Sequence, residues 1–173
     1  YPGFAFDKFE NRETEEPGFV PGIAPEFFRI GGLFKDPNWG GACVMTPWYY
    51  YREYGDVNIL RQNFGLMQSY VDHLERRSVN GVLKEYAQMG EWGQLNENTP
   101  AALVATCAFY QQAVTLSGIA GILGNIQEEE RYREMGKRIQ EGFHADAECW
   151  QPEKEIYGNG SQASYGCCLL YTS

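Results

Sequence analysis

Two short segments of the sequence place a tryptophan next to glycine, and both are predicted to lie on loops. The segments are Asn38-Trp39-Gly40-Gly41 and Gly90-Glu91-Trp92-Gly93. The apolar face of a pyranose ring can lie on an indole, and glycine lets the backbone come close to a ligand. Trp39 and Trp92 are therefore candidate sugar-stacking residues. The sequence leaves open the alternative that each indole closes the end of a helical bundle.

Carboxylates are the second kind of side chain that could act on a sugar. Glycoside hydrolysis uses two of them, about 6.5–9.5 Å apart for inversion or about 5–5.5 Å apart for retention of configuration. Glu91 and Glu26 are the best placed to contact a sugar hydroxyl. The acidic run 13–16 is typical of a solvated surface. The acidic residues 128–130 are typical of the first turn of a helix, where they complement its dipole.

The sequence gives no indication of a metal, a cofactor or an activated nucleophile. His73 and His144 lie on predicted helices, and no serine or cysteine is placed in the sequence so as to indicate a Ser-His or Cys-His catalytic pair. Both histidines are therefore expected to be structural. The five cysteines form no Cys-x-x-Cys pair and have no histidine at zinc-ligand spacing. Cys107 is expected to be a small buried apolar residue. We therefore expect neither a metal site nor a cofactor.

Composition and charge exclude several classes of protein. The chain has 173 residues, of which 43% are hydrophobic and 15% aromatic, and this does not fit a disordered chain. The mean hydropathy of −0.46 and the lack of a long apolar run argue against a membrane span. The 14 basic and 23 acidic residues give a net charge of −9, which argues against binding to nucleic acid or to an anionic membrane. Cysteine usage leaves the cellular compartment open.

Apolar spacing predicts a mostly α-helical chain. A start rich in loops precedes four predicted helices, and a loop with the beginning of a further helix follows them. The expected ranges are 1–41 for the start, then 42–54, 56–78, 99–124 and 127–145 for the helices, and 151–173 for the final part. Asp56 and Thr99 are the predicted N-caps of the second and third helices, with Pro100 in the first turn. Pro47 is expected to be tolerated only near the first turn of its helix.

The four predicted helices alternate between two types. The helix at 99–124 is apolar on more than one face and is expected to be an inner helix, whereas 127–145 carries one apolar stripe. Helices joined in this way form hairpins that must stack on others. Both a double-layered helical toroid and an open helical-repeat array fit this pattern. Both ends of the chain are expected to be truncations of a larger domain, and the sequence leaves open whether residues 167–173 belong to the natural gene.

With these motifs assembled, the chain resembles the catalytic domain of bacterial α-L-rhamnosidases of glycoside hydrolase family 78. The resemblance depends on the order and spacing of many short matches along nearly the whole chain. They are Val20-Pro21-Gly22-Ile23-Ala24-Pro25, Pro37-Asn38-Trp39-Gly40, Thr46-Pro47-Trp48, Tyr54-Gly55-Asp56, Ile59-Leu60, Gly90-Glu91-Trp92-Gly93, Thr99-Pro100, Ile119-Ala120, Leu123-Gly124, Tyr157-Gly158 and Gly160-Ser161-Gln162.

The resemblance implies an all-α fold, part of an (α/α)6 barrel of the six-hairpin glycosidase type. It also implies inverting hydrolysis of terminal α-L-rhamnosyl groups by two glutamates, one acid and one base. Neither glutamate has a matching position here, so no catalytic residue is assigned. Trp39 and Trp92 match aromatic residues that line the rhamnose pocket. Glu91 stands where the family commonly has aspartate, and Gly41 stands where a small or acidic residue is more usual.

The expected partners are a rhamnose-containing glycoside or oligosaccharide and the remaining parts of the chain's own catalytic domain. Nucleic acid and membranes are not expected partners. If Trp39 and Trp92 bind one sugar, they should face a single concave opening at one end of the helices. A helical-repeat interaction module and another six-hairpin carbohydrate-active enzyme are the alternative interpretations. The isolated chain is expected to be inactive, because its general acid and base lie outside it, and poorly soluble.

Overall fold

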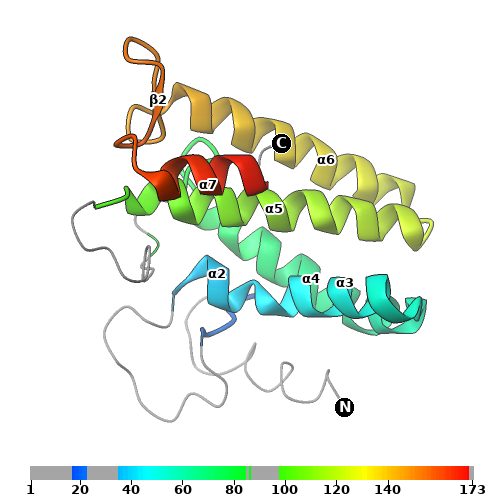
Figure 1. The fold of residues 1–173 in the computed structure, drawn as a ribbon. Helices are drawn as coiled ribbons and strands as arrows, with labels where there is room; N and C mark the ends of the chain where they lie inside the picture. Colours follow the sequence, from blue (N-terminus) through cyan, green and yellow to red (C-terminus); the bar gives the residue numbers. More distant parts are fainter. Residues whose placement is uncertain (1–16, 23–34, 85, 87–97, 172–173) are drawn as a thin grey trace.

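The computed structural model describes residues 17–22, 35–84, 86 and 98–171, and it is mostly helical (Figure 1). Five α-helices longer than one turn are present in this part of the chain, together with a one-turn helix and a two-stranded antiparallel sheet. The elements are α2 (Pro37–Gly40), α3 (Ala42–Tyr54), α4 (Val57–Arg77), α5 (Ala101–Ile122), α6 (Ile126–Ala145), β1 (Trp150–Gln151), β2 (Ile156–Tyr157) and α7 (Gln162–Tyr171). In the sheet, Trp150 pairs with Tyr157.

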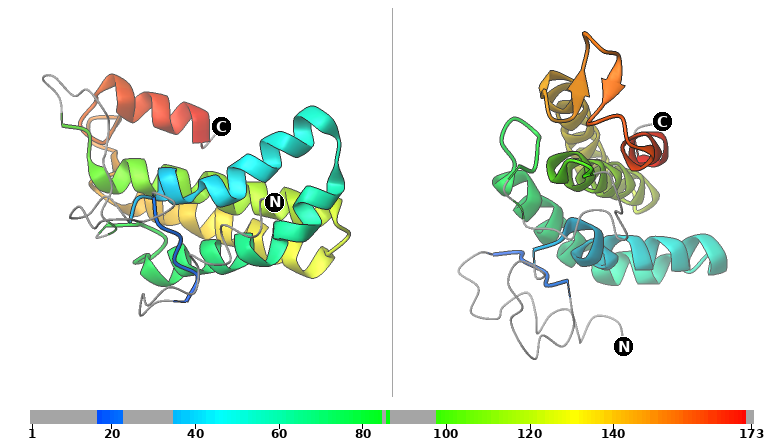
Figure 2. Two further views of the ribbon diagram at one scale, coloured as in Figure 1. Left: turned by 90° about the horizontal axis from the view of Figure 1, so that it is seen from below. Right: turned by 60° about the vertical axis from the view of Figure 1, so that its left-hand side comes forward.

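The helices form two layers of antiparallel hairpins. Helices α3, α5 and α7 run in the same direction, and α4 and α6 run back behind them (Figures 1 and 2). Helix α5 lies in the centre and contacts α3, α4, α6 and α7. The segments that lead into α3, α5 and α7 therefore gather at one end of the molecule.

The predicted inner and outer characters of α5 and α6 are confirmed. Fourteen of the 22 residues of α5 are buried, on all of its faces. Its 18-residue apolar window, with a mean hydropathy of 1.2, is long enough to cross a membrane, but 72% of that window is buried inside the fold, as in the core helix of a globular domain. Helix α6 buries one stripe, made of Tyr132, Met135, Gly136, Ile139 and Phe143.

Two helix starts follow the local sequence signals. Asp56 caps α4, and its carboxylate accepts a hydrogen bond from the Asn58 backbone N–H at 2.9 Å. The preceding Gly55 has φ +70°, a left-handed conformation that ends α3 at little steric cost. Asn125 caps α6, and Glu128 and Glu129 lie in its first turn, as predicted.

Two predictions about proline are wrong. Pro100, not Thr99, is the N-cap of α5: its ψ of 127° keeps it out of the helical conformation, and the Thr99 hydroxyl bonds Ser161 instead. Pro47 is the sixth residue of α3, one turn deeper than expected. Proline has no backbone N–H to donate to the Cys43 carbonyl oxygen, so α3 lacks that hydrogen bond, and Pro47 itself is buried.

Candidate functional site

The candidate site lies where the segments entering α3, α5 and α7 gather. Helix α2, which directly precedes α3, carries Trp39 at this end, and residues 98–100 enter α5 at the same end (Figure 2). The start of α7 lies at this end too, whereas the β1–β2 hairpin lies on the other side of α5 from α2 (Figure 2). Glu91, Trp92 and Glu26 lie outside the described residues.

Trp39 is held on a capped single turn and is partly open to solvent. Asp36, 2% exposed, accepts hydrogen bonds from the backbone N–H groups of Asn38 at 2.8 Å and Trp39 at 3.3 Å. These bonds satisfy two of the free N–H groups of the turn. The Trp39 side chain keeps 48% of its surface exposed. An indole that is half exposed and fixed at its backbone can offer one face to a flat apolar surface such as a sugar ring.

A chain of buried hydroxyl groups joins the start of α5 to the start of α7. The Thr99 and Ser161 hydroxyl oxygens lie 2.8 Å apart, and those of Ser161 and Ser164 lie 2.9 Å apart. Ser164 also donates to Asn159 Oδ1 at 3.1 Å, and the Asn159 amide donates to the Asn98 carbonyl at 3.1 Å. These bonds fix the backbone that leads into α5 from Asn98, the first described residue of this segment, onward.

Each histidine has a polar neighbour within hydrogen-bonding distance, and the structural role expected for both stays a prediction. His73 is buried, and its Nε2 lies 3.2 Å from the hydroxyl of Tyr86. His144 Nδ1 lies 2.9 Å from the Gln140 carbonyl oxygen on the same helix. Cys107 is fully buried in an apolar cluster, which confirms its predicted role. Across the part of the chain that the structure describes, no group of three or more His, Cys, Asp or Glu side chains could hold a metal ion.

A groove of about 520 Å³ lies between the C-terminal parts of α4 and α6 and includes Glu75, Ser78, Asn80 and Arg138 among its lining residues. The Arg138 guanidinium and the Glu75 carboxylate form an ion pair at 2.6 Å in its wall. Trp39, the one predicted sugar-binding residue that the structure describes, is not among the residues that line this groove.

Gln112 of α5, whose Nε2 donates a hydrogen bond to the Pro37 carbonyl oxygen of α2, was not predicted from the sequence, and neither was the hydroxyl cluster. Apolar periodicity marked α5 as buried but gave no reason to single out one glutamine on it. The Gly160-Ser161-Gln162 fragment contributed to the family resemblance, but its hydroxyl contacts depend on Thr99, 62 positions away. Pairing between such distant residues leaves no local pattern in the sequence.

Helical hairpins stacked in two layers, with their connecting segments gathered at one end, define a class of α-hairpin domains that includes both closed toroids and open arrays. A family model described as the bacterial alpha-L-rhamnosidase 6 hairpin glycosidase domain matches residues 6–172. The chain therefore belongs to this family, and its helices form part of a six-hairpin barrel. This assignment decides between the two architectures that the helix pattern left open.

Two solved structures share this fold. The Streptomyces avermitilis α-L-rhamnosidase, solved in complex with L-rhamnose, matches with a TM-score of 0.81 and 22% identity, over 99% of this chain and 16% of that one. The α-L-rhamnosidase from Dictyoglumus thermophilum matches with a TM-score of 0.79 and 24% identity, over 95% of this chain and 19% of that one.

The chain is also similar in sequence to curated proteins named α-L-rhamnosidase. An α-L-rhamnosidase of Streptomyces avermitilis is 30% identical over 76% of this chain, and one of Formosa agariphila is 26% identical over 76% of this chain. The matches cover 12% and 15% of those two relatives. The chain thus spans about a seventh of the length of the curated relatives it matches.

Proposed function

We propose that the chain is part of an α-L-rhamnosidase, a glycoside hydrolase that removes terminal α-L-rhamnosyl groups from glycosides or oligosaccharides. The observation that carries this proposal is the family match over residues 6–172. Its support from geometry is the gathering of Trp39 and the segments entering α5 and α7 at one end of the inner helices. Loops positioned by a rigid helical scaffold are where catalytic and binding residues concentrate.

In this function Trp39 serves as one wall of the sugar subsite, and Trp92 as another. The half-exposed indole of Trp39 and the capped turn beneath it favour this role. A pyranose that stacks on an indole buries apolar C–H groups on the ring and keeps its hydroxyls free for polar partners. Glu91, next to Trp92 in sequence, would accept a hydrogen bond from one of those hydroxyls.

The proposed reaction is a single displacement with inversion. One carboxylic acid protonates the leaving oxygen while a second carboxylate removes a proton from water on the opposite face of the sugar. Neither carboxyl group is assigned to this chain, so the chain contributes binding and orientation of the sugar. We therefore expect the purified 173-residue chain alone to show no turnover of a nitrophenyl α-L-rhamnoside.

The test is an assay of the complete product of the gene that encodes this chain. It should hydrolyse para-nitrophenyl α-L-rhamnoside and leave the corresponding α-mannoside and β-glucoside largely intact. Proton NMR during the first turnovers should show β-L-rhamnose as the first product, which then equilibrates to the mixed anomers. Preference for another glycoside would assign the chain to a different six-hairpin enzyme. Release of α-L-rhamnose first would contradict inversion.

A further inference from the structure

The single turn α2, which carries Trp39, contacts two buried polar side chains from the helices beneath it. Gln112 of α5 is 2% exposed, and its Nε2 donates a 2.6 Å hydrogen bond to the Pro37 carbonyl oxygen. Tyr70 of α4 is fully buried, and its hydroxyl lies close to Gly40. Both contacts join residues far apart in sequence, so the position of the turn is set by tertiary structure.

An isolated helix of a single turn is not stable in water. Helix α2 has four residues, and helix nucleation is unfavourable because several backbone dihedrals are fixed for each hydrogen bond gained. Within the turn, Gly40 N–H donates to the Asp36 carbonyl oxygen at 2.9 Å and Gly41 N–H to the Pro37 carbonyl oxygen at 3.1 Å. Contacts from outside the turn must therefore stabilise it, and Gln112 makes such a contact at its first residue.

The fit between the turn and these side chains is close. A Cβ atom on Gly41 would overlap the Gln112 amide and lie 2.6 Å from the Pro37 carbonyl oxygen. A Cβ atom on Gly40 would lie 2.5 Å from the Tyr70 hydroxyl oxygen and 2.9 Å from the Val20 carbonyl oxygen. Because both glycines lack a side chain, the turn packs directly on the Gln112 amide and the Tyr70 hydroxyl.

The polar character of Gln112 contributes little net stability. Its Oε1 has no hydrogen-bond partner in the part of the chain that the structure describes. An unpartnered buried oxygen costs free energy that offsets the gain from the bond to Pro37. The Pro37 carbonyl oxygen also keeps a second donor, the Gly41 N–H. The main physical effect of the Gln112 amide is therefore to fix the place of α2 on α5.

We propose that Gln112 is a positioning residue for Trp39: its hydrogen bond to Pro37 fixes the α2 turn, so that the indole meets the sugar at a constant height and angle. This inference rests on the proposed function for the role of Trp39. Gln112 does not touch the sugar; it acts two residues away from Trp39, through the backbone of the turn. A stacking platform must be held rigid by its supporting residues to retain its full binding effect.

The matched variants are Gln112→Met and Gln111→Met in the complete gene product. Methionine keeps the length of the side chain and removes the donor. Gln111, the neighbouring residue on α5, is half-buried and points about 100° around the helix from Gln112, so the same substitution there is the control. The first readout is backbone hydrogen exchange of residues 37–41, measured by mass spectrometry. The second is KM and kcat for para-nitrophenyl α-L-rhamnoside.

We expect Gln112→Met to accelerate exchange of the Gly40 and Gly41 amides about tenfold or more, as loss of one hydrogen bond implies. It should raise KM about three- to tenfold and change kcat less than about twofold, because the lost interaction acts on sugar binding in ground and transition states alike. Gln111→Met should change neither. The thermal unfolding midpoint of both variants should stay close to that of the unmodified protein.

Unchanged exchange in Gln112→Met, or an equal effect in Gln111→Met, would overturn the proposal. So would accelerated exchange without a rise in KM, provided that Trp39→Ala does raise KM. If Trp39→Ala itself leaves KM unchanged, then the sugar contact proposed for Trp39 fails, and the positioning proposal fails with it; the exchange data would still report whether Gln112 holds the turn. The two failures are therefore distinguishable.

Discussion

The hydroxyl oxygens of Thr99 and Ser161 lie 2.8 Å apart, although 62 positions separate the two residues in sequence. This contact joins the segment that enters α5 to the segment that enters α7. Ser164 extends it to Asn159, and Thr99, Ser161 and Ser164 are buried. A buried polar network therefore stabilises the end of the molecule at which we place the sugar subsite. Helix α2 packs at the same end, so apolar packing is not the only stabilising interaction there.

Replacing Ser164 by alanine should destabilise this network. The substitution removes the donor to Asn159 Oδ1 and one of the two hydroxyl partners of Ser161. We expect a loss of about 1–2 kcal/mol in the free energy of unfolding, measured by urea denaturation. Ser69→Ala is the control, because Ser69 is half-buried and outside the network. Equal losses in the two variants would show that the network contributes no special stability.

Two buried tyrosines should respond differently to loss of the hydroxyl group. Tyr132 donates to Asp72 Oδ1 at 3.0 Å and accepts from Arg131 at 2.9 Å, whereas the Tyr70 hydroxyl has no partner among the described residues. Tyr132→Phe should therefore cost about 1–2 kcal/mol, and Tyr70→Phe should change stability by less than about 0.5 kcal/mol or raise it. Calorimetric unfolding of the two variants measures this difference. A larger loss for Tyr70→Phe would mean that its hydroxyl is bonded.

Stability at alkaline pH should depend on Cys149. Burial raises the pKa of its thiol to about 12, from an ordinary value of 9.0, with a smaller contribution from the nearby charge of Asp146. As pH rises past about 9, the unfolded chain loses this proton before the folded chain does, so the unfolding free energy falls by up to about 1.4 kcal/mol per pH unit. Cys149→Ala should make this fall less steep between about pH 8.5 and 10.5. Parallel curves for the two proteins would argue against a buried, neutral thiol.

Glycine is required at position 41 for a reason specific to Gln112. Gly41→Ala places a methyl group against the Gln112 amide and the Pro37 carbonyl oxygen, and should cost about 1–3 kcal/mol. Gly65→Ala is the matched control, because Gly65 lies inside α4 and a Cβ atom there meets no described residue within 4 Å. That change should stabilise the protein by about 0.5–1 kcal/mol. Thermal unfolding of both variants provides the comparison, and a neutral Gly41→Ala would contradict the close fit of α2.

Local signals in the sequence predicted the helices well where their ends are set locally. Asp56 caps α4 as expected, and the predicted start of the last outer helix at 127 is one residue from the observed Ile126. Thr99 looked like a cap because a hydroxyl preceded a proline, but its hydroxyl is engaged by Ser161 from a distant segment. A tertiary hydrogen bond of this kind competes with capping and is invisible to a local pattern.

The candidate site was predicted in part. Trp39 was identified from its glycine neighbours and its resemblance to a sugar-binding motif, and the structure places it, half-exposed, on α2. Gln112 and Tyr70, which contact its turn, could not be identified, because apolar spacing marks a helix as buried without indicating which polar residue faces which partner. The predicted roles of Glu91 and Trp92 lie outside the described residues and stay predictions.

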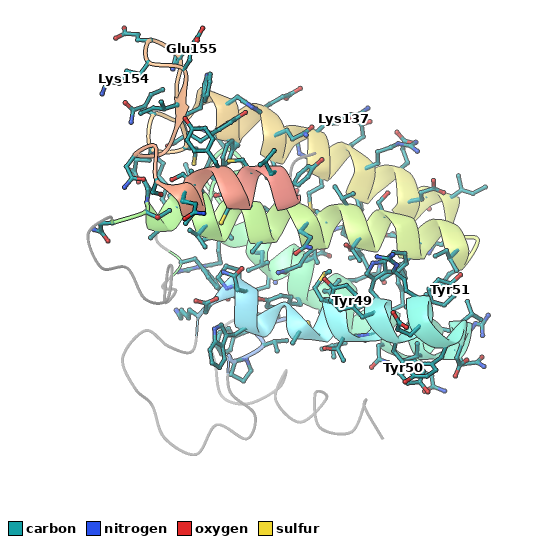
Figure 3. All side chains as sticks on the ribbon, in the orientation of Figure 1. Tyr49, Tyr50, Tyr51, Lys137, Lys154 and Glu155 are labelled. Carbon is teal, nitrogen blue, oxygen red and sulfur yellow. The ribbon has the colours of Figure 1, made fainter. Side chains whose placement is uncertain are left out.

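Exposed aromatic residues also occur far from α2, and they provide a control for the role of Trp39. Figure 3 shows the exposed Tyr49 and Tyr50 along α3, and Tyr54 ends that helix with 73% of its surface exposed. Tyr54 is the thirteenth residue of α3, which puts it about 20 Å along the helix from the turn that carries Trp39. An effect on sugar binding that is specific to the site should therefore appear at Trp39 and not at Tyr54.

The contact proposed between Trp39 and the sugar of an α-L-rhamnoside is tested by comparing Trp39→Ala with Tyr54→Ala in the complete gene product. KM for para-nitrophenyl α-L-rhamnoside, together with the Kd of free L-rhamnose measured by calorimetry, is the quantity to compare. Loss of the stacked indole should raise both constants about tenfold or more, and Tyr54→Ala should leave both within about twofold of the unmodified protein. Unchanged constants in a folded Trp39→Ala protein would contradict the claim.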